Sequence, residues 1–165
     1  MRNWAITAEP RDETYRTLIR TAVARGAVGG LVANFTSWDA PFAKFMSELV
    51  PHTLSVEETF EWPGTVVGGG NDGNKGPRDE WPRLHKFSLN QDVVHLLTSY
   101  AFGLYDWLHP RLPEDLCFFD QAGRVWMTST SHERDAYLTL AETELRNLLV
   151  LVPSLVGTRG KEEEA

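Results

Sequence analysis

Residues 115–130 read DLCFFDQAGRVWMTST, and this segment indicates the class of sheet that the chain forms. Asp115–Phe119 and Arg124–Thr130 read as short strands, and the residues between them, Asp120–Gly123, read as the turn of a hairpin. Strands joined by so short a turn run antiparallel. A third strand is expected at Asp135–Leu140. The segment therefore predicts a sheet that is at least partly antiparallel.

The other expected elements precede and follow this hairpin. Apolar residues spaced three and four apart predict helices, and short apolar or alternating runs predict strands. The helices are expected at residues 12–25, 39–50, 91–108 and 139–152, and the strands at residues 3–8, 27–35, 53–62 and 84–89. With the late hairpin, this order favours an α+β fold over a doubly wound one. We predict a single domain over residues 1–156, with a mixed or antiparallel sheet and helices mainly on one face.

The helix at 91–108 carries the strongest local signals. Ser88-x-x-Gln91 fits a capping box that would begin it. Apolar residues then cover most of its circumference, so the helix is expected to be buried on several sides. His95 within it is expected to be a hydrogen-bonded core residue.

Two segments are expected to lack fixed structure. Residues 66–82 contain the glycine-rich run GGGNDGNKGP at 68–77, whose residues favour turns and lose much entropy on ordering. We expect a flexible loop that joins two strands. Residues 157–165, which include Glu162–Glu164, are expected to form a disordered acidic tail.

Net charge narrows the class of partner. The 165 residues include 16 Lys and Arg and 23 Asp and Glu, which gives a net charge of −7. Nucleic-acid binding needs a cationic surface that releases counterions from phosphate, so nucleic acid is not expected as a partner. An acidic surface allows a basic protein partner, because opposite charge speeds encounter. The alternative is that the charge only keeps the protein soluble, and the oligomeric state is not indicated.

Composition also indicates a compartment. With one cysteine, Cys117, the chain has no internal disulfide, which fits a reducing environment. No apolar run approaches the roughly 20 residues that span a bilayer. Met1–Trp4 lacks the basic and apolar regions that begin a signal peptide. We therefore expect a cytoplasmic protein without a membrane partner, in which Cys117 is a small buried residue.

The glycine-rich run does not match the ligand-binding motifs closest to it. A phosphate-binding loop has lysine directly after its second glycine, whereas Asn74 follows Gly73. An EF-hand loop starting at Asp72 would need glycine at its sixth position and glutamate at its twelfth, where the chain has Pro77 and Arg83. The histidines show no metal-ligand spacing with one another or with the cysteine. No cofactor and no metal are expected.

The densest polar run beside a strand, Ser129–Asp135, supplies the candidate catalytic residues His132, Glu133 and Asp135. A histidine and a carboxylate can form an acid–base pair, with a serine hydroxyl as nucleophile. However, no Gly-x-Ser-x-Gly elbow is present, and neighbouring residues on an extended segment point to opposite faces, so His132 and Glu133 would not converge. A polar connection between strands explains the run equally well. The run is also a candidate surface for a partner, formed by Ser131, His132, Glu133, Arg134 and Asp135.

Trp62 and Trp81 flank the glycine-rich loop, where a large aromatic side chain is expected to be partly exposed. Exposed tryptophans often anchor interfaces, so both are candidate binding residues. The alternative is that they close the ends of the core.

Two stretches resemble segments of small uncharacterised bacterial proteins. They are Glu61–Thr65, and Leu112–Phe118 together with Ser131–Ala136. The resemblance covers well under half of the chain, and its second stretch is the more specific. It implies a bacterial cytosolic origin and supplies no catalytic residues. Small acidic single-domain proteins of this general type often resemble immunity proteins of toxin systems, which is an analogy of class.

These observations predict a non-enzymatic protein-binding domain, with an immunity protein or toxin inhibitor as its specific form. It would use acidic and aromatic surface around the Trp62–Trp81 loop and the Ser129–Asp135 turn. The alternative is a small hydrolase or transferase that uses His132 with Glu133 or Asp135.

Overall fold

The computed structural model describes residues 1–33, 38–67, 78–155 and 159–160. The helices in these ranges are α1 (Asp12–Ala24), α2 (Ala40–Leu49), α3 (Gln91–Tyr100) and α4 (Glu142–Leu151), with short 3₁₀ helices that include η2 (Arg78–Glu80) and η3 (Leu104–Asp106). The strands are β1 (Arg2–Ala5), β2 (Val28–Ala33), β3 (Thr53–Glu58), β4 (Glu61–Trp62), β5 (Thr65–Val66), β6 (Arg83–Ser88), β7 (Glu114–Phe119), β8 (Val125–Thr130), β9 (Asp135–Leu140) and β10 (Arg159–Gly160). The glycine-rich run at 68–77 and residues 161–165 of the predicted tail lie outside the described residues.

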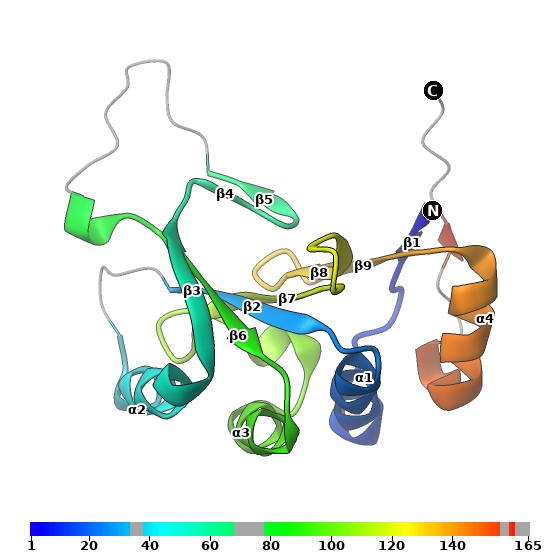
Figure 1. The fold of residues 1–165 in the computed structure, drawn as a ribbon, viewed down its shortest axis with the longest axis horizontal. Coiled ribbons are helices and arrows are strands. Elements are labelled where there is room, and N and C mark those ends of the chain that lie inside the picture. The colour runs from blue at the N-terminus through cyan, green and yellow to red at the C-terminus, as the bar shows by residue number, and fades with distance from the viewer. Residues whose placement is uncertain (34–37, 68–77, 156–158, 161–165) are drawn as a thin grey trace.

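One sheet organises the described part of the chain, in the order β10-β1-β9-β8-β7-β2-β6-β3. Each neighbouring pair of strands in it is antiparallel. The predicted hairpin is β7–β8, and β9 pairs with β8 as the predicted third strand. Figure 1 shows α1 to α4 along one face of this sheet and the small β4–β5 hairpin above the other. The predicted α+β fold, with helices mainly on one face, is confirmed.

The main core lies between the sheet and the helices. The apolar stripe of α1 supplies Leu18, Ile19 and Ala22, which are fully buried. Tyr15 of the same stripe donates a hydrogen bond from its hydroxyl to the Leu97 carbonyl of α3 (3.2 Å) and accepts one from Trp107 Nε1 (2.9 Å). These bonds satisfy the polar atoms of two large buried side chains, and they tie α1 to α3 and to the chain after η3.

A second, smaller apolar cluster lies on the opposite face of the sheet. It consists of Val32, Trp62, Leu84, Cys117 and Phe119. Trp62 belongs to the β4–β5 hairpin, whereas the other members belong to β2, β6 and β7. The hairpin therefore covers part of the face that the helices leave open.

The predicted strand at 53–62 is wrong in its second half, and the difference creates this hairpin. β3 ends at Glu58, and the chain turns at Thr59, whose Oγ1 accepts a hydrogen bond from the Glu61 backbone (3.0 Å). A threonine hydroxyl that bonds locally in this way competes with the ladder of a continuing strand. β4 then pairs with β5, separately from the main sheet.

The predicted helix at 91–108 ends at Tyr100. The backbone amides of Phe102 and Gly103 donate to Asp106 Oδ2 (2.8 Å each), so this carboxylate holds the chain in a turn that leads into η3. The helix is capped by Asn90, whose Oδ1 accepts from the Val93 amide (3.0 Å), and not by Ser88. His95 is exposed, so its prediction as a core residue was wrong.

Two residues of the predicted tail form a strand. Ala5 and Trp4 of β1 pair with Arg159 and Gly160 of β10. β1 lies near the edge of the sheet and offers backbone donors and acceptors that an adjacent segment can pair.

Candidate functional site

The buried carboxylate of Asp115 brings together residues that lie far apart in the sequence. Asp115 is 0% exposed and has a φ of 58°, a left-handed conformation that aspartate tolerates better than most residues. Its Oδ2 accepts hydrogen bonds from Trp62 Nε1 (2.9 Å) and from Thr65 Oγ1 (3.3 Å). Its Oδ1 accepts from the Ser131 backbone amide (2.8 Å). The structure thus joins the β4–β5 hairpin to the β8–β9 turn through one side chain.

The turn of the hairpin also rests directly on β8. Gly64 has a φ of +88°, and a Cβ placed on it would lie 2.5 Å from Thr128 Oγ1 and 2.9 Å from Thr130 Oγ1. Thr130 Oγ1 donates to the Gly64 carbonyl (3.3 Å). Glycine is needed here both for the backbone conformation and for the close approach to the strand.

His132 and Glu133 lie at the exposed tip of the β8–β9 turn. His132 Nε2 and Glu133 Oε1 are 3.7 Å apart. The expectation that these side chains would point to opposite faces was wrong, because the two residues lie in a turn and not in a strand. Both side chains are more than half exposed, so the pair has little energetic weight and remains accessible to a partner.

Arg134 and Asp135 have partners within the protein. Arg134 has a φ of 56°, and its Nη2 donates to Glu9 Oε2 (3.1 Å) while its guanidinium lies over the ring of Tyr105. Asp135 Oδ2 accepts a hydrogen bond from the Tyr137 hydroxyl (2.6 Å). The Arg134 contacts tie the turn to Glu9 and Tyr105, and the Tyr137 hydroxyl occupies one oxygen of Asp135.

Trp62 and Trp81 do not form one site. Trp62 is buried on Asp115 and in the small apolar cluster, so the expectation that it is partly exposed was wrong. Trp81 is half-buried, packs against Phe60 with ring centroids 5.0 Å apart, and has the Arg78 guanidinium over its ring. Trp62 therefore holds the hairpin against the main sheet, and Trp81 packs on Phe60, the residue before β4.

Glu114, which precedes Asp115 in the sequence, has a raised pKa. Partial burial of Glu114, and secondly the negative charge of Asp115, raise the pKa of its carboxyl. The nearby His109 and His132 oppose that shift. Burial likewise raises the pKa of the Cys117 thiol, which is fully buried, as predicted for a small core residue.

The serine hydroxyl next to His132 in the sequence is buried. Ser131, the serine closest to His132 in the sequence, is 2% exposed, and its Oγ is buried without a hydrogen-bond partner among the described residues. A substrate therefore has no approach to that hydroxyl. The described ranges also contain no group of three or more His, Cys, Asp or Glu residues placed to hold a metal ion.

Sequence reasoning missed Asp115 as the centre of this arrangement. Its one visible signal is a carboxylate placed directly before the strongly apolar run Leu116–Phe119. A charge at the start of a buried strand is costly unless it is hydrogen-bonded, so it predicts donors from elsewhere in the chain. The pattern does not say which donors these are.

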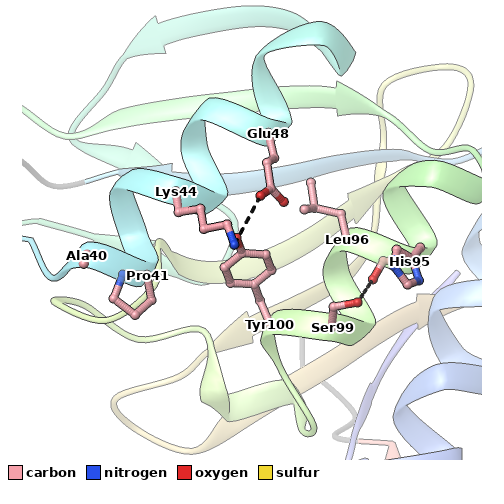
Figure 2. Close-up of a pocket in the computed structure, with 8 residues that line it drawn as sticks. All are labelled: Ala40, Pro41, Lys44, Glu48, His95, Leu96, Ser99 and Tyr100. Atoms are coloured by element: carbon pink, nitrogen blue, oxygen red, sulfur yellow. Dashed lines mark hydrogen bonds and ion pairs between the residues drawn. The ribbon is translucent and has the colours of Figure 1, made fainter.

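Two hollows lie on the helical side of the molecule and were not predicted. Figure 2 shows the groove between α2 and α3, where the ring of Tyr100 points toward Lys44 and Glu48. Partial burial and the negative charge of Glu48 raise the pKa of the Tyr100 hydroxyl. The groove encloses about 590 Å³.

Tyr100 also lines the second hollow, a cavity of about 560 Å³ that we call the arginine cavity. The residues that line it are Tyr100 at the end of α3, the segment that follows, and Arg11, which directly precedes α1. They are Arg11, Tyr100, Phe102, Tyr105, Asp106, Leu108, His109, Pro110, Arg111 and Leu112.

Comparison of the chain with known protein families, curated proteins and solved structures finds no match. No helix within the described ranges is long and apolar enough to cross a membrane.

Proposed function

We propose that this chain is a non-enzymatic protein-binding domain, and that its specific form is an inhibitor of the immunity-protein class. Its contact surface, here called the hairpin surface, consists of the exposed residues Glu61 and Val66 of the β4–β5 hairpin and His132 and Glu133 of the β8–β9 turn. The observation that carries this proposal is the set of hydrogen bonds that joins both segments to Asp115.

The β4–β5 hairpin contributes no residue to the main hydrophobic core. Among the described residues, the main core between helices and sheet includes none from Thr59–Val67. The hairpin is held instead by the small cluster around Trp62 and by a buried carboxylate whose desolvation has to be offset. A segment that the main core does not need, yet that is fixed so firmly, fits a preorganised contact surface.

The outer side of the hairpin has the composition of an interface. Val66 is 72% exposed, which leaves an apolar side chain in water next to polar neighbours. A shallow groove of about 580 Å³ runs between the hairpin and Val125 at the start of β8. An apolar centre with a polar rim is the usual anatomy of a protein–protein contact.

The charge of the chain favours a basic partner. The net charge is −7, and the Glu61 side chain has no ion-pair partner among the described residues. Glu133 lies on the same surface. Acidic groups at the rim of a contact increase the rate of encounter with a cationic protein, and this increase falls with salt.

The hydrolase or transferase alternative has less geometric support. His132 has an exposed carboxylate neighbour in Glu133. Asp135, however, is bonded to Tyr137, and the Ser131 hydroxyl is buried. Of the cavities described above, none is lined by His132. A histidine at the tip of an exposed turn can contact a protein partner without further rearrangement.

The test is affinity purification of the tagged chain from its own host, with mass spectrometry of stoichiometric partners, for the wild type and two variants. Val66→Lys places a positive charge on the hairpin surface and is expected to remove a basic partner. Val150→Lys makes the same change at an exposed valine of α4 and is expected to keep it.

Two results would overturn the proposal. One is a partner that is retained by both variants or lost by both, since the contact would then lie elsewhere. The other is the absence of any stoichiometric partner. The inhibitor role has its own test: expression of the partner alone should arrest growth, and co-expression of this chain should restore it.

A further inference from the structure

We propose that the arginine cavity binds a small organic anion. A carboxylate or phosphate group would lie between the guanidinium groups of Arg11 and Arg111, and an apolar body would lie against Phe102 and Leu108. This site is separate from the hairpin surface and does not depend on the function proposed above.

Both guanidinium groups have donors to offer. Arg111 is exposed, and no hydrogen bond or ion pair joins its side chain to another described residue. Arg11 donates to Glu9 Oε1 (2.9 Å) and to Asp106 Oδ1 (3.3 Å), both from Nη1. Its Nη2 and Nε have no partner among the described residues. Guanidinium groups bind carboxylates and phosphates through such parallel pairs of N–H donors.

The carboxylate that lines the cavity, Asp106, pairs with Arg11 and leaves Arg111 unpaired among the described residues. Asp106 Oδ2 already accepts the backbone amides of Phe102 and Gly103 (2.8 Å each), and its Oδ1 accepts from Arg11. Both of its oxygens therefore have partners within the protein, while its negative charge still pairs with Arg11. Arg11 also pairs with Glu9, whose other oxygen accepts from Arg134. Three arginines (Arg11, Arg111 and Arg134) therefore stand against two carboxylates (Glu9 and Asp106), which leaves one net positive charge around the cavity, although the whole chain carries −7.

An independent observation is an unpaired polar atom in the cavity wall. The Nε2 of His109 is buried and has no hydrogen-bond partner among the described residues. A buried ring nitrogen without a partner is costly. Because this atom has no exposed surface, as the Ser131 hydroxyl has none, a ligand oxygen reaches it only when the cavity wall moves.

The apolar part of the ligand is indicated by two large side chains left in water. Phe102 is 53% exposed and Leu108 is 38% exposed, and both line the cavity. Its volume of about 560 Å³ is in the range of sites for small molecules, which is roughly 300–1,000 Å³. Mixed cationic and apolar lining of this size fits an anion with one aromatic or branched aliphatic group.

The experiment is an NMR titration of the isotope-labelled full chain with phenyl phosphate and with benzoate. Inorganic phosphate and phenol are the controls, since each carries only one half of phenyl phosphate, the anionic group or the aromatic ring. We expect saturable shifts in the amide signals of residues 102–112, with a Kd on the order of 1 mM for the tighter of the two probes. The tighter probe identifies the anionic group. Each half alone should bind at least about tenfold more weakly.

Arg111→Gln should weaken binding of the tighter probe at least about tenfold, because it removes a charge-assisted contact. Arg146→Gln makes the same charge change on α4 and should leave the Kd within about twofold. The proposal is overturned if neither probe saturates, if phenol or inorganic phosphate binds as tightly as phenyl phosphate, or if both variants weaken binding equally.

Discussion

The hairpin surface is held by hydrogen bonds between segments far apart in the sequence, whereas the arginine cavity is built mainly from one stretch of chain, residues 100–112. In the first region Trp62, Thr65 and Ser131 all donate to the buried carboxylate of Asp115. In the second region the principal groups, Phe102, Leu108 and Arg111, are exposed. The buried carboxylate of the first region is used within the protein, whereas the Arg111 guanidinium of the second remains available to a ligand.

Because of this difference, substitutions in the first region should change the free energy of unfolding, and those in the second should change ligand affinity. A side chain that satisfies buried donors contributes to the folded state, so its loss is measured in unfolding experiments. A side chain without partners in the protein contributes little to folding, so its loss is measured in binding. Substitutions in the two regions should therefore have opposite profiles.

The largest effect is expected for Asp115→Ala, which leaves the Trp62 indole N–H and the Ser131 amide buried without an acceptor. The free energy of unfolding should fall by about 3 kcal/mol, measured by urea denaturation. Asp115→Asn retains an acceptor and tolerates the left-handed backbone, so it should lose only about 1 kcal/mol. Equal losses for the two variants would mean that the hydrogen bonds do not hold the hairpin.

A smaller loss, about 2 kcal/mol, is expected for Gly64→Ala. The new Cβ would combine a strained φ of +88° with a contact against Thr128 Oγ1. Gly123→Ala is the matched control, because Gly123 has a φ of +78° and nothing within 4 Å of the added atom. The stability lost in Gly64→Ala minus that lost in Gly123→Ala measures the cost of the added contact between the hairpin and β8. If the two losses are the same, that contact has no energetic weight.

Glu114→Gln should change how stability depends on pH. Burial raises the pKa of Glu114 in the folded state, so the folded protein binds this proton more tightly than the unfolded chain does. The wild type therefore loses stability as pH rises from the unfolded value, near 4.5, through the raised folded value. The variant lacks this loss, so its stability relative to the wild type should increase with pH over that range in urea denaturation series.

Glu57→Gln provides a control of opposite sign. The hydrogen bond from Lys86 lowers the pKa of Glu57, so its contribution to stability is present above pH 4.5 and is lost as pH falls through the lowered value. This variant should be less stable than the wild type at neutral pH, and the difference should vanish in acid. The same trend in both variants would contradict the assignment for Glu114.

The smallest effect on stability is expected for Arg111→Gln, whose free energy of unfolding should stay within about 0.5 kcal/mol of the wild type. The same variant is expected to have the largest effect on anion binding. A loss of stability comparable to that of Asp115→Ala would show that Arg111 is a structural residue, and the contrast between the two regions would fail.

The sequence by itself determined the α+β class, the antiparallel β7–β8–β9 segment and the approximate places of the four helices. These features follow from local patterns: the apolar stripe of α1, the turn at Asp120–Gly123 and the proline after α2. It also named Trp62 and Ser131, but as binding residues on the surface, whereas the structure buries both side chains (7% and 2% exposed).

Only the tertiary structure decided that Trp62 and Ser131 donate to the same carboxylate, because Asp115 is separated from them by 53 and 16 positions in the sequence. The same holds for the turn at Thr59 and for the end of α3, where hydrogen bonds from the backbone to one side chain outweigh the apolar pattern. The arginine cavity also depends on contacts across the chain, since Arg11 reaches it through Asp106, 95 positions away. A sequence pattern reports what each segment prefers alone, whereas a buried charge or an exposed arginine is defined by what the fold places around it.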